Sequence, residues 1–97
     1  MAVTVIVETQ VKPEHREELE ATFREAIADT RAYDGCLEFN IHINREDDCN
    51  WVFFERWESR EHYDRYLAWR IESGFFDGIT AMLTGEASFR YFDLSDI

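Results

Sequence analysis

The fold of this 97-residue chain is decided by the stretch Trp51-Val52-Phe53-Phe54-Glu55-Arg56-Trp57-Glu58-Ser59. Its aromatic and β-branched residues predict a strand, and Ser59 predicts the N-cap of a helix that follows at once. The strand is apolar on both faces, so both faces need cover. The chain's own helices can supply one cover, and we expect a second copy of the chain to supply the other. Glu55 lies among these aromatic residues, where an uncompensated charge is costly to bury.

The segments around this strand alternate in type. Residues 36–44 alternate between apolar and polar and predict its antiparallel partner, across a polar turn at residues 45–48. The other predicted elements are strands over residues 2–11 and 86–93, and helices over residues 13–33, 59–73 and 75–83. The order β-α-β-β-α-β is that of a ferredoxin-like sandwich. We expect one α+β domain over residues 1–97, with a four-stranded antiparallel sheet, helices on one face and a homodimer through the other.

The pairing of the two central strands fixes which side chains share a face. A turn centred on residues 47 and 48 predicts that paired positions sum to about 95. Asn40 then lies opposite Glu55, His42 opposite Phe53, and Glu38 opposite Trp57. A slip of one residue would reassign both faces.

Charge and composition narrow the classes of partner. The net charge is −11 and the ten lysines and arginines form no cluster, which argues against nucleic acid and against an anionic membrane surface. No signal peptide or long apolar run is seen. Cys36 and Cys49 are predicted to lie toward opposite ends of a hairpin, too far apart to bridge. Unpaired thiols favour a reducing compartment, so we expect a cytoplasmic protein.

The chemistry-bearing residues predict a small-molecule pocket. The three histidines are scattered without metal-ligand spacing, so no metal site is predicted, and four dispersed glycines offer no phosphate loop. An apolar pocket with a few convergent polar tips is typical of a ligand site. The candidates are Asn40, His42, Glu55, Trp57, Tyr63, Tyr66, Trp69 and Arg70. The alternative is structural, because aromatic residues at helical spacing usually belong to a core and Arg70 can extend to solvent.

The residues Gly35-Cys36-Leu37-Glu38-Phe39 and Glu55-Arg56-Trp57-Glu58-Ser59-Arg60-Glu61 resemble the antibiotic biosynthesis monooxygenase domain. The resemblance covers the whole chain in element order, and its most specific part is the Glu-x-Trp-x-Ser junction between strand and helix. It implies a dimeric ferredoxin-like α+β barrel. It also implies oxidation of quinols or anthrones by O₂ with neither metal nor flavin, whereas related members degrade haem.

The chain departs from the family pattern at several positions. Many members carry a His about nine residues after the junction Trp, where this chain has Tyr66, and a Ser-x-His motif is replaced by Trp69-Arg70-Ile71. The haem-degrading branch has a Trp at the Tyr66 position, a His at the Phe76 position and an Asn on the first strand. None of these is present, so the resemblance favours quinol-type oxygenation without a cofactor.

These residues suggest roles in such a reaction. His42 is the predicted base, Tyr66 and Asn40 the predicted hydrogen-bond partners of the substrate oxygens, Trp57 a stacking surface and Arg70 a charge that steadies an anion. Two alternatives remain open. One is a dimeric module that binds a small aromatic ligand without turnover, and the other is an isomerase or cyclase on the same fold.

Overall fold

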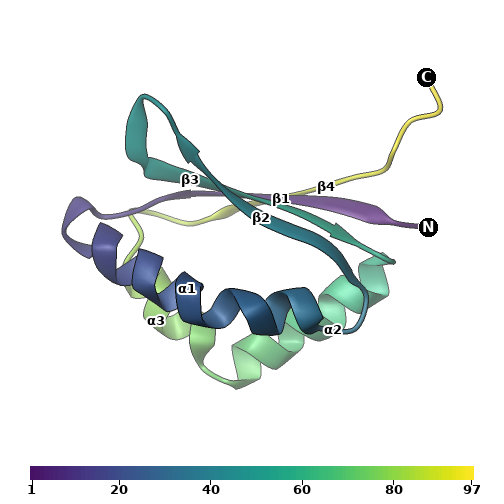
Figure 1. Ribbon diagram of the computed structural model, residues 1–97, viewed down its shortest axis with the longest axis horizontal. Coiled ribbons are helices and arrows are strands. Elements are labelled where there is room, and N and C mark those ends of the chain that lie inside the picture. Colours follow the sequence, from purple (N-terminus) through teal and green to yellow (C-terminus); the bar gives the residue numbers. More distant parts are fainter.

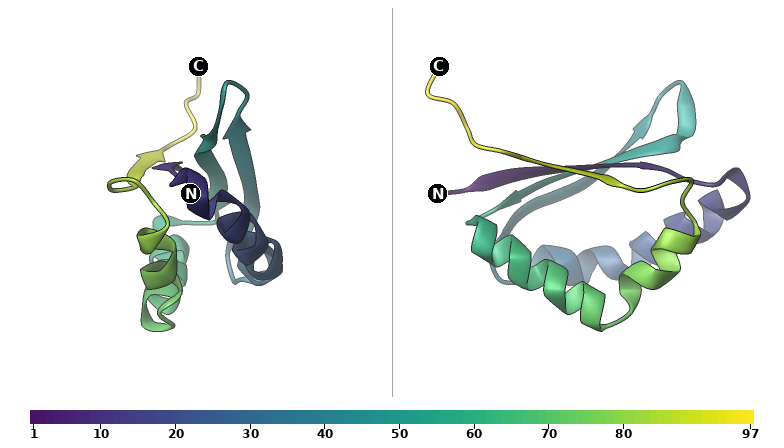
Figure 2. Two further views of the ribbon diagram at one scale, coloured as in Figure 1. Left: turned by 90° about the vertical axis from the view of Figure 1, so that its left-hand side faces the viewer. Right: turned by 180° about the vertical axis from the view of Figure 1, so that it is seen from behind.

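The computed structural model describes all 97 residues and places the helices on one face of a four-stranded sheet (Figures 1 and 2). The elements are β1 (Val3–Gln10), a 3₁₀ turn (Pro13–His15), α1 (Arg16–Ala32), β2 (Cys36–Asn44), β3 (Asp47–Trp57), α2 (Arg60–Glu72), α3 (Phe75–Ala81) and β4 (Ser88–Phe92). The sheet order is β2-β3-β1-β4 and every neighbouring pair is antiparallel. The predicted ferredoxin-like α+β fold is confirmed, and β3 lies between β1 and β2 as its two-sided apolar pattern predicts.

The predicted register between β2 and β3 was wrong by one residue. Asn40 pairs with Phe54 and His42 with Val52, whereas Glu55 pairs with Phe39. The turn lies at residues 45 and 46, and an irregularity between Ile43 and Asn44 takes up the extra residues of β3. Because side chains alternate along a strand, this slip moves Asn40 and His42 to the face opposite Glu55 and Trp57.

Packing against the helices explains this register. Phe39 and Phe53 both face the helices, and Phe53 meets the ring of Phe23 from α1 with centroids 4.9 Å apart. Bonds within the hairpin hold the irregularity in place, since Trp51 Nε1 donates to the Asp48 carbonyl over 2.8 Å. A buried aromatic cluster therefore selects the pairing that the turn residues alone do not define.

The helix α2 begins where predicted and buries Arg70 on its inward face. Ser59 caps it by accepting a hydrogen bond from the His62 backbone N–H. Its buried residues are Tyr63, Tyr66 and Arg70, spaced three and four apart, while the neighbouring Ile71 is 60% exposed. The guanidinium thus occupies the inward stripe that an aliphatic residue usually fills.

A sharp bend separates α2 from α3. Gly74 has a φ of 77°, in the left-handed region that favours glycine, and it joins the two helices into a V beneath the sheet (Figure 2). The predicted break near this residue is confirmed. No helix of the chain is long and apolar enough to span a membrane.

Candidate functional site

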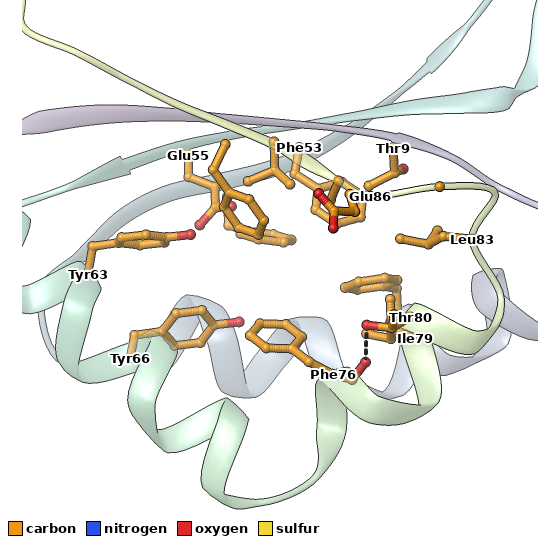
Figure 3. Close-up of a pocket in the computed structure, with 16 residues that line it drawn as sticks. Thr9, Phe53, Glu55, Tyr63, Tyr66, Phe76, Ile79, Thr80, Leu83 and Glu86 are labelled. Carbon is orange, nitrogen blue, oxygen red and sulfur yellow. Dashed lines mark hydrogen bonds between the residues drawn. The ribbon is translucent and has the colours of Figure 1, made fainter.

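A cavity of about 440 Å³ lies between the inner face of the sheet and the V formed by α2 and α3 (Figure 3). Of its 16 lining residues, 11 are hydrophobic. The charged lining residues are Glu55 and Glu86, and the lining contains no lysine, arginine or histidine. Its size and mostly apolar wall are typical of a small-molecule site.

Glu55 is the buried carboxylate of the cavity. It projects from β3 and is 3% exposed, with one hydrogen bond, from Trp57 Nε1 to its Oε1 over 3.0 Å. Burial raises its pKa from 4.5 to about 7, and the bond from Trp57 lowers it in part. A carboxylate whose pKa lies near neutral pH can accept a proton from a bound ligand and later return it.

Two tyrosines of α2 face Glu55 across the cavity. Figure 3 shows the hydroxyls of Tyr63 and Tyr66 pointing from the helix toward the cavity, with that of Tyr63 directed at Glu55. Burial is the main cause that raises both tyrosine pKa values, so both phenols keep their protons at neutral pH. The cavity thus has a proton acceptor on the sheet wall and hydroxyl donors on the helix wall.

A buried polar cluster contacts the Tyr66 hydroxyl, and its other members do not line the cavity. Arg70 is 6% exposed and its Nε donates to the Tyr66 hydroxyl over 3.2 Å. Its Nη2 donates to Thr30 Oγ1 over 2.8 Å and to the Ala26 carbonyl over 3.1 Å. The Thr30 and Tyr66 hydroxyls are 2.9 Å apart. Every hydrogen-bond partner of this guanidinium is therefore neutral, and its charge lies one residue behind the cavity wall.

Residues 2–69 match the family of antibiotic biosynthesis monooxygenases. The chain belongs to this family. The matched segment runs from β1 to most of α2 and includes Glu55, Tyr63 and Tyr66. The fold class and the family that the Glu-x-Trp-x-Ser junction predicts are both confirmed.

Solved structures agree with this family fold over nearly the whole chain. The structure of an antibiotic biosynthesis monooxygenase superposes with a TM-score of 0.88 at 24% identity, covering 96% of this chain and 98% of that one. SnoaB from Streptomyces nogalater, a cofactor-independent oxygenase, superposes with a TM-score of 0.83 at 19% identity, covering 99% and 95%. At these identities the likeness establishes the fold alone.

A sequence relative is the uncharacterized protein sll1783 of Synechocystis, which is 22% identical over 94 residues. This match covers 97% of the chain but 64% of the relative. The chain therefore spans less than two thirds of the length of that protein.

The structure brings together some of the predicted site residues of this family member. Glu55, Tyr63 and Tyr66 line the cavity. Trp57 is fully buried behind Glu55, with its ring 4.8 Å from that of Tyr66, so it supports the wall and offers no free stacking surface. Arg70 supports Tyr66 in the same way.

Three predicted residues lie elsewhere. Trp69 is 37% exposed and stacks on Tyr33 with centroids 5.2 Å apart. His42 is exposed on the outer sheet face, where its ring meets Phe54 edge-on at 6.4 Å. Asn40 donates to Glu38 and accepts from Arg31 beside a second hollow between α1 and β2. The one-residue slip in register accounts for the displacement of Asn40 and His42.

Some cavity residues were not predicted as site residues. Phe76 and Ile79 of α3, with Leu83 just after it, form the far wall of the cavity. Glu86 lies at its mouth before β4 and is exposed, and the sequence around it gives no signal of this position. Core and cavity residues share one apolar pattern, so the sequence does not separate them.

A separate group of possible metal ligands lies outside the cavity. Asp34, Glu58 and His62 bring ligand atoms within 4.8 Å of one another near the start of α2. The two carboxylates are exposed, and the group shares no residue with the cavity wall.

Proposed function

We propose that this chain is a cofactor-independent monooxygenase that oxidises a small quinol- or anthrone-like aromatic with O₂. The observation that carries the proposal is Glu55, a buried carboxylate with a pKa of about 7 that faces an apolar cavity opposite two tyrosine hydroxyls. Such a reaction needs an enzyme that deprotonates a phenol or enol and keeps water from the resulting anion. In this proposal Glu55 is the base, the role that the sequence analysis predicts for His42.

The cavity wall favours a neutral substrate. Two carboxylates and no cationic side chain line it, so a ligand that enters with a carboxylate or phosphate meets like charge and no counter-ion. The volume suits a molecule of one to three fused rings, and the phenylalanines Phe23, Phe39 and Phe53 offer apolar contact to it.

The oxidation balances without an added reductant. Glu55 accepts the proton of a phenol or enol, and the electron pair stays on the substrate, whose carbanion form reduces O₂. For an anthrone, the methylene carbon gains one oxygen atom and becomes a carbonyl, and the second oxygen atom leaves as water with the two methylene hydrogens. The substrate supplies all four electrons, and the protein supplies the base, hydrogen-bond donors and a cavity that excludes water.

Labelled oxygen tests the activity. Anthrone and naphthalene-1,4-diol are incubated with the protein under ¹⁸O₂, under nitrogen and without protein. We expect protein-dependent product with one labelled oxygen atom only when O₂ is present. Glu55→Gln keeps the shape and removes the base, so turnover is expected to fall about 10²–10⁴-fold. Glu61→Gln, on the exposed surface of α2, is the matched control and is expected to turn over like the wild type.

The same incubations distinguish the two alternatives. An isomerase or cyclase needs only a base and a donor, which Glu55 and Tyr66 supply, and its product would form under nitrogen with no label. A binding module would hold the quinol and release it unchanged. Either result with the whole panel would contradict the monooxygenase proposal.

We also propose that the chain forms a homodimer through the outer face of the sheet, in the cytoplasm. Ile6 pairs with Phe54 on this face, which no helix covers, and Phe92 there is 43% exposed. Both cysteines are free, which suits a reducing compartment. Sedimentation is expected to show a dimer for the wild type and a monomer for Phe54→Glu. Ala21→Glu adds the same charge on an exposed part of α1 and should leave a dimer. A monomeric wild type would contradict the proposal.

A further inference from the structure

The buried cluster of Arg70, Thr30, Tyr66 and Ala26 contains an excess of hydrogen-bond donors. Arg70 has donors only, and it gives bonds to both hydroxyl oxygens and to the Ala26 carbonyl. The two hydroxyls are joined by one bond of 2.9 Å, which uses one of their two protons. One hydroxyl proton therefore remains and needs an acceptor.

The position of Ala26 shows which hydroxyl keeps that proton. The hydroxyls of Thr22 and Thr80 donate to the carbonyl four residues earlier in their helices. Thr30 does not make this bond, and Arg70 Nη2 occupies the Ala26 carbonyl instead. Thr30 is 2% exposed, so its proton has one acceptor within reach, the Tyr66 oxygen. The Tyr66 oxygen then accepts from both Thr30 and Arg70, and its own proton is left over.

Tyr66 is the one member of this cluster that lines the cavity, so the cavity is the side on which a ligand can accept the remaining proton. We propose that Arg70 is a positioning residue that turns the hydroxyl proton of Tyr66 into the cavity and makes it the donor to the anionic oxygen of a bound phenol or enol. This inference rests on the proposed function. It identifies the group that stabilises the substrate anion after the proton has been transferred. The substrate proton passes to Glu55, and the electron pair left on the substrate oxygen is held by the Tyr66 O–H.

The surroundings of Arg70 suit such a role. Its guanidinium lies 4.2 Å from the ring centre of Phe75 and 4.5 Å from that of Trp69, so aromatic faces and neutral acceptors surround a charge that has no carboxylate partner. Water screens a buried charge little, so the guanidinium strongly polarises the Tyr66 hydroxyl that it contacts over 3.2 Å. The other ionisable groups at this end of the cavity are Glu55 and Tyr63, and the anion forms when Glu55 has taken up the proton.

A coloured phenol tests this role without any turnover. The visible absorbance of 4-nitrophenol separates phenolate from phenol, so titration with excess protein gives the ratio of the two affinities. We expect Arg70→Met to lower the preference for phenolate about tenfold or more, the range for a lost charge-assisted hydrogen bond. In a Tyr66→Phe background the same change is expected to have less than a twofold effect, because Arg70 acts through the hydroxyl. Arg70→Lys, which keeps the charge, should restore part of the preference.

Thr30→Val decides the direction of the bond between the two hydroxyls. If Thr30 donates to Tyr66, its removal weakens the phenolate preference by a few-fold. If Tyr66 donated to Thr30, the variant would free the tyrosine proton and raise the preference, which would overturn the inference. Equal losses for Arg70→Met with and without the Tyr66 hydroxyl would overturn it too, as would a wild type that binds no 4-nitrophenol.

Circular dichroism confirms that each variant is folded before its titration is interpreted. The nitrophenol is not consumed by oxygen, so the titration does not depend on turnover. A chain that gives this pattern yet incorporates no labelled oxygen would contradict the monooxygenase proposal and keep the role of Arg70.

Discussion

Glu55 and Arg70 are the two charged side chains that the fold buries, and the fold compensates the cost of burying them in different ways. Both are nearly inaccessible, at 3% and 6% exposure, and neither has a partner of opposite charge among its hydrogen bonds. Glu55 has one donor, and its pKa rises to about 7. Arg70 cannot lose its proton, so the fold gives it three acceptors and two aromatic faces.

The difference teaches which side chain is available for chemistry. A group with few partners and a shifted pKa changes charge easily, which is what a proton acceptor requires. A group that keeps its proton and is held by three hydrogen bonds keeps its charge and its position, which suits a residue that orients another. Glu55 on the sheet wall therefore changes its charge near neutral pH, whereas Arg70 behind the helix wall keeps its charge.

Replacing each side chain at low pH gives the largest expected difference between the two. Arg70→Ala leaves three acceptors without their donor and a void beside Phe75, so we expect a loss of about 4 kcal/mol in the free energy of unfolding. Glu55→Gln at pH 5 replaces a protonated carboxyl by a neutral amide of the same shape, and a change within about 1 kcal/mol is expected.

Urea denaturation at pH 5 measures both free energies. Arg70→Met separates volume from hydrogen bonding, since it fills most of the void, and it should fall between the two. Equal losses in the free energy of unfolding for Arg70→Ala and Glu55→Gln would contradict this difference between the two groups.

The pH dependence of stability tests the carboxyl alone. The folded protein holds the Glu55 proton up to about pH 7, whereas the unfolded chain releases it near the ordinary value of 4.5. Between these values the folded state binds more protons, so this group's contribution to stability is complete below pH 4.5 and is lost as pH rises through 7. We expect the wild type to lose roughly 3 kcal/mol relative to Glu55→Gln over this range.

Paired thermal and urea unfolding of the two proteins from pH 4 to pH 9 gives this difference directly. The other carboxylates are common to both chains and cancel. A difference that stays constant with pH would mean that Glu55 has the same pKa in the folded and the unfolded protein.

The sequence predicted the sheet, the helix cap and the inward Glu55, because alternation and capping are local patterns. It placed Asn40 and His42 on the wrong face because the register of β2 and β3 depends on the exact position of the turn and on the irregularity next to it. A shift of one residue there moves every side chain of β2 to the other face. The sequence did not predict the roles of Thr30 and Ala26. These roles depend on how α1 packs against α2. That packing brings Thr30 and Ala26, which are 40 and 44 positions from Arg70 in the sequence, to the same guanidinium.

Trp57 provides the smallest and most specific test of the comparison. It gives Glu55 its one hydrogen bond, and that bond lowers the pKa of Glu55 because it favours the charged carboxylate. Trp57→Phe should therefore raise the pKa further and move the acid limb of the kcat/KM profile to higher pH by up to about one unit. Trp51→Phe is the matched control, because Trp51 is equally buried but donates to the Asp48 carbonyl in the hairpin. If neither variant moved the acid limb from its wild-type position, Glu55 would not be the group that limits activity at low pH. The difference in titration between Glu55 on the sheet and the Tyr66–Arg70 pair on the helix would then have no role in the reaction.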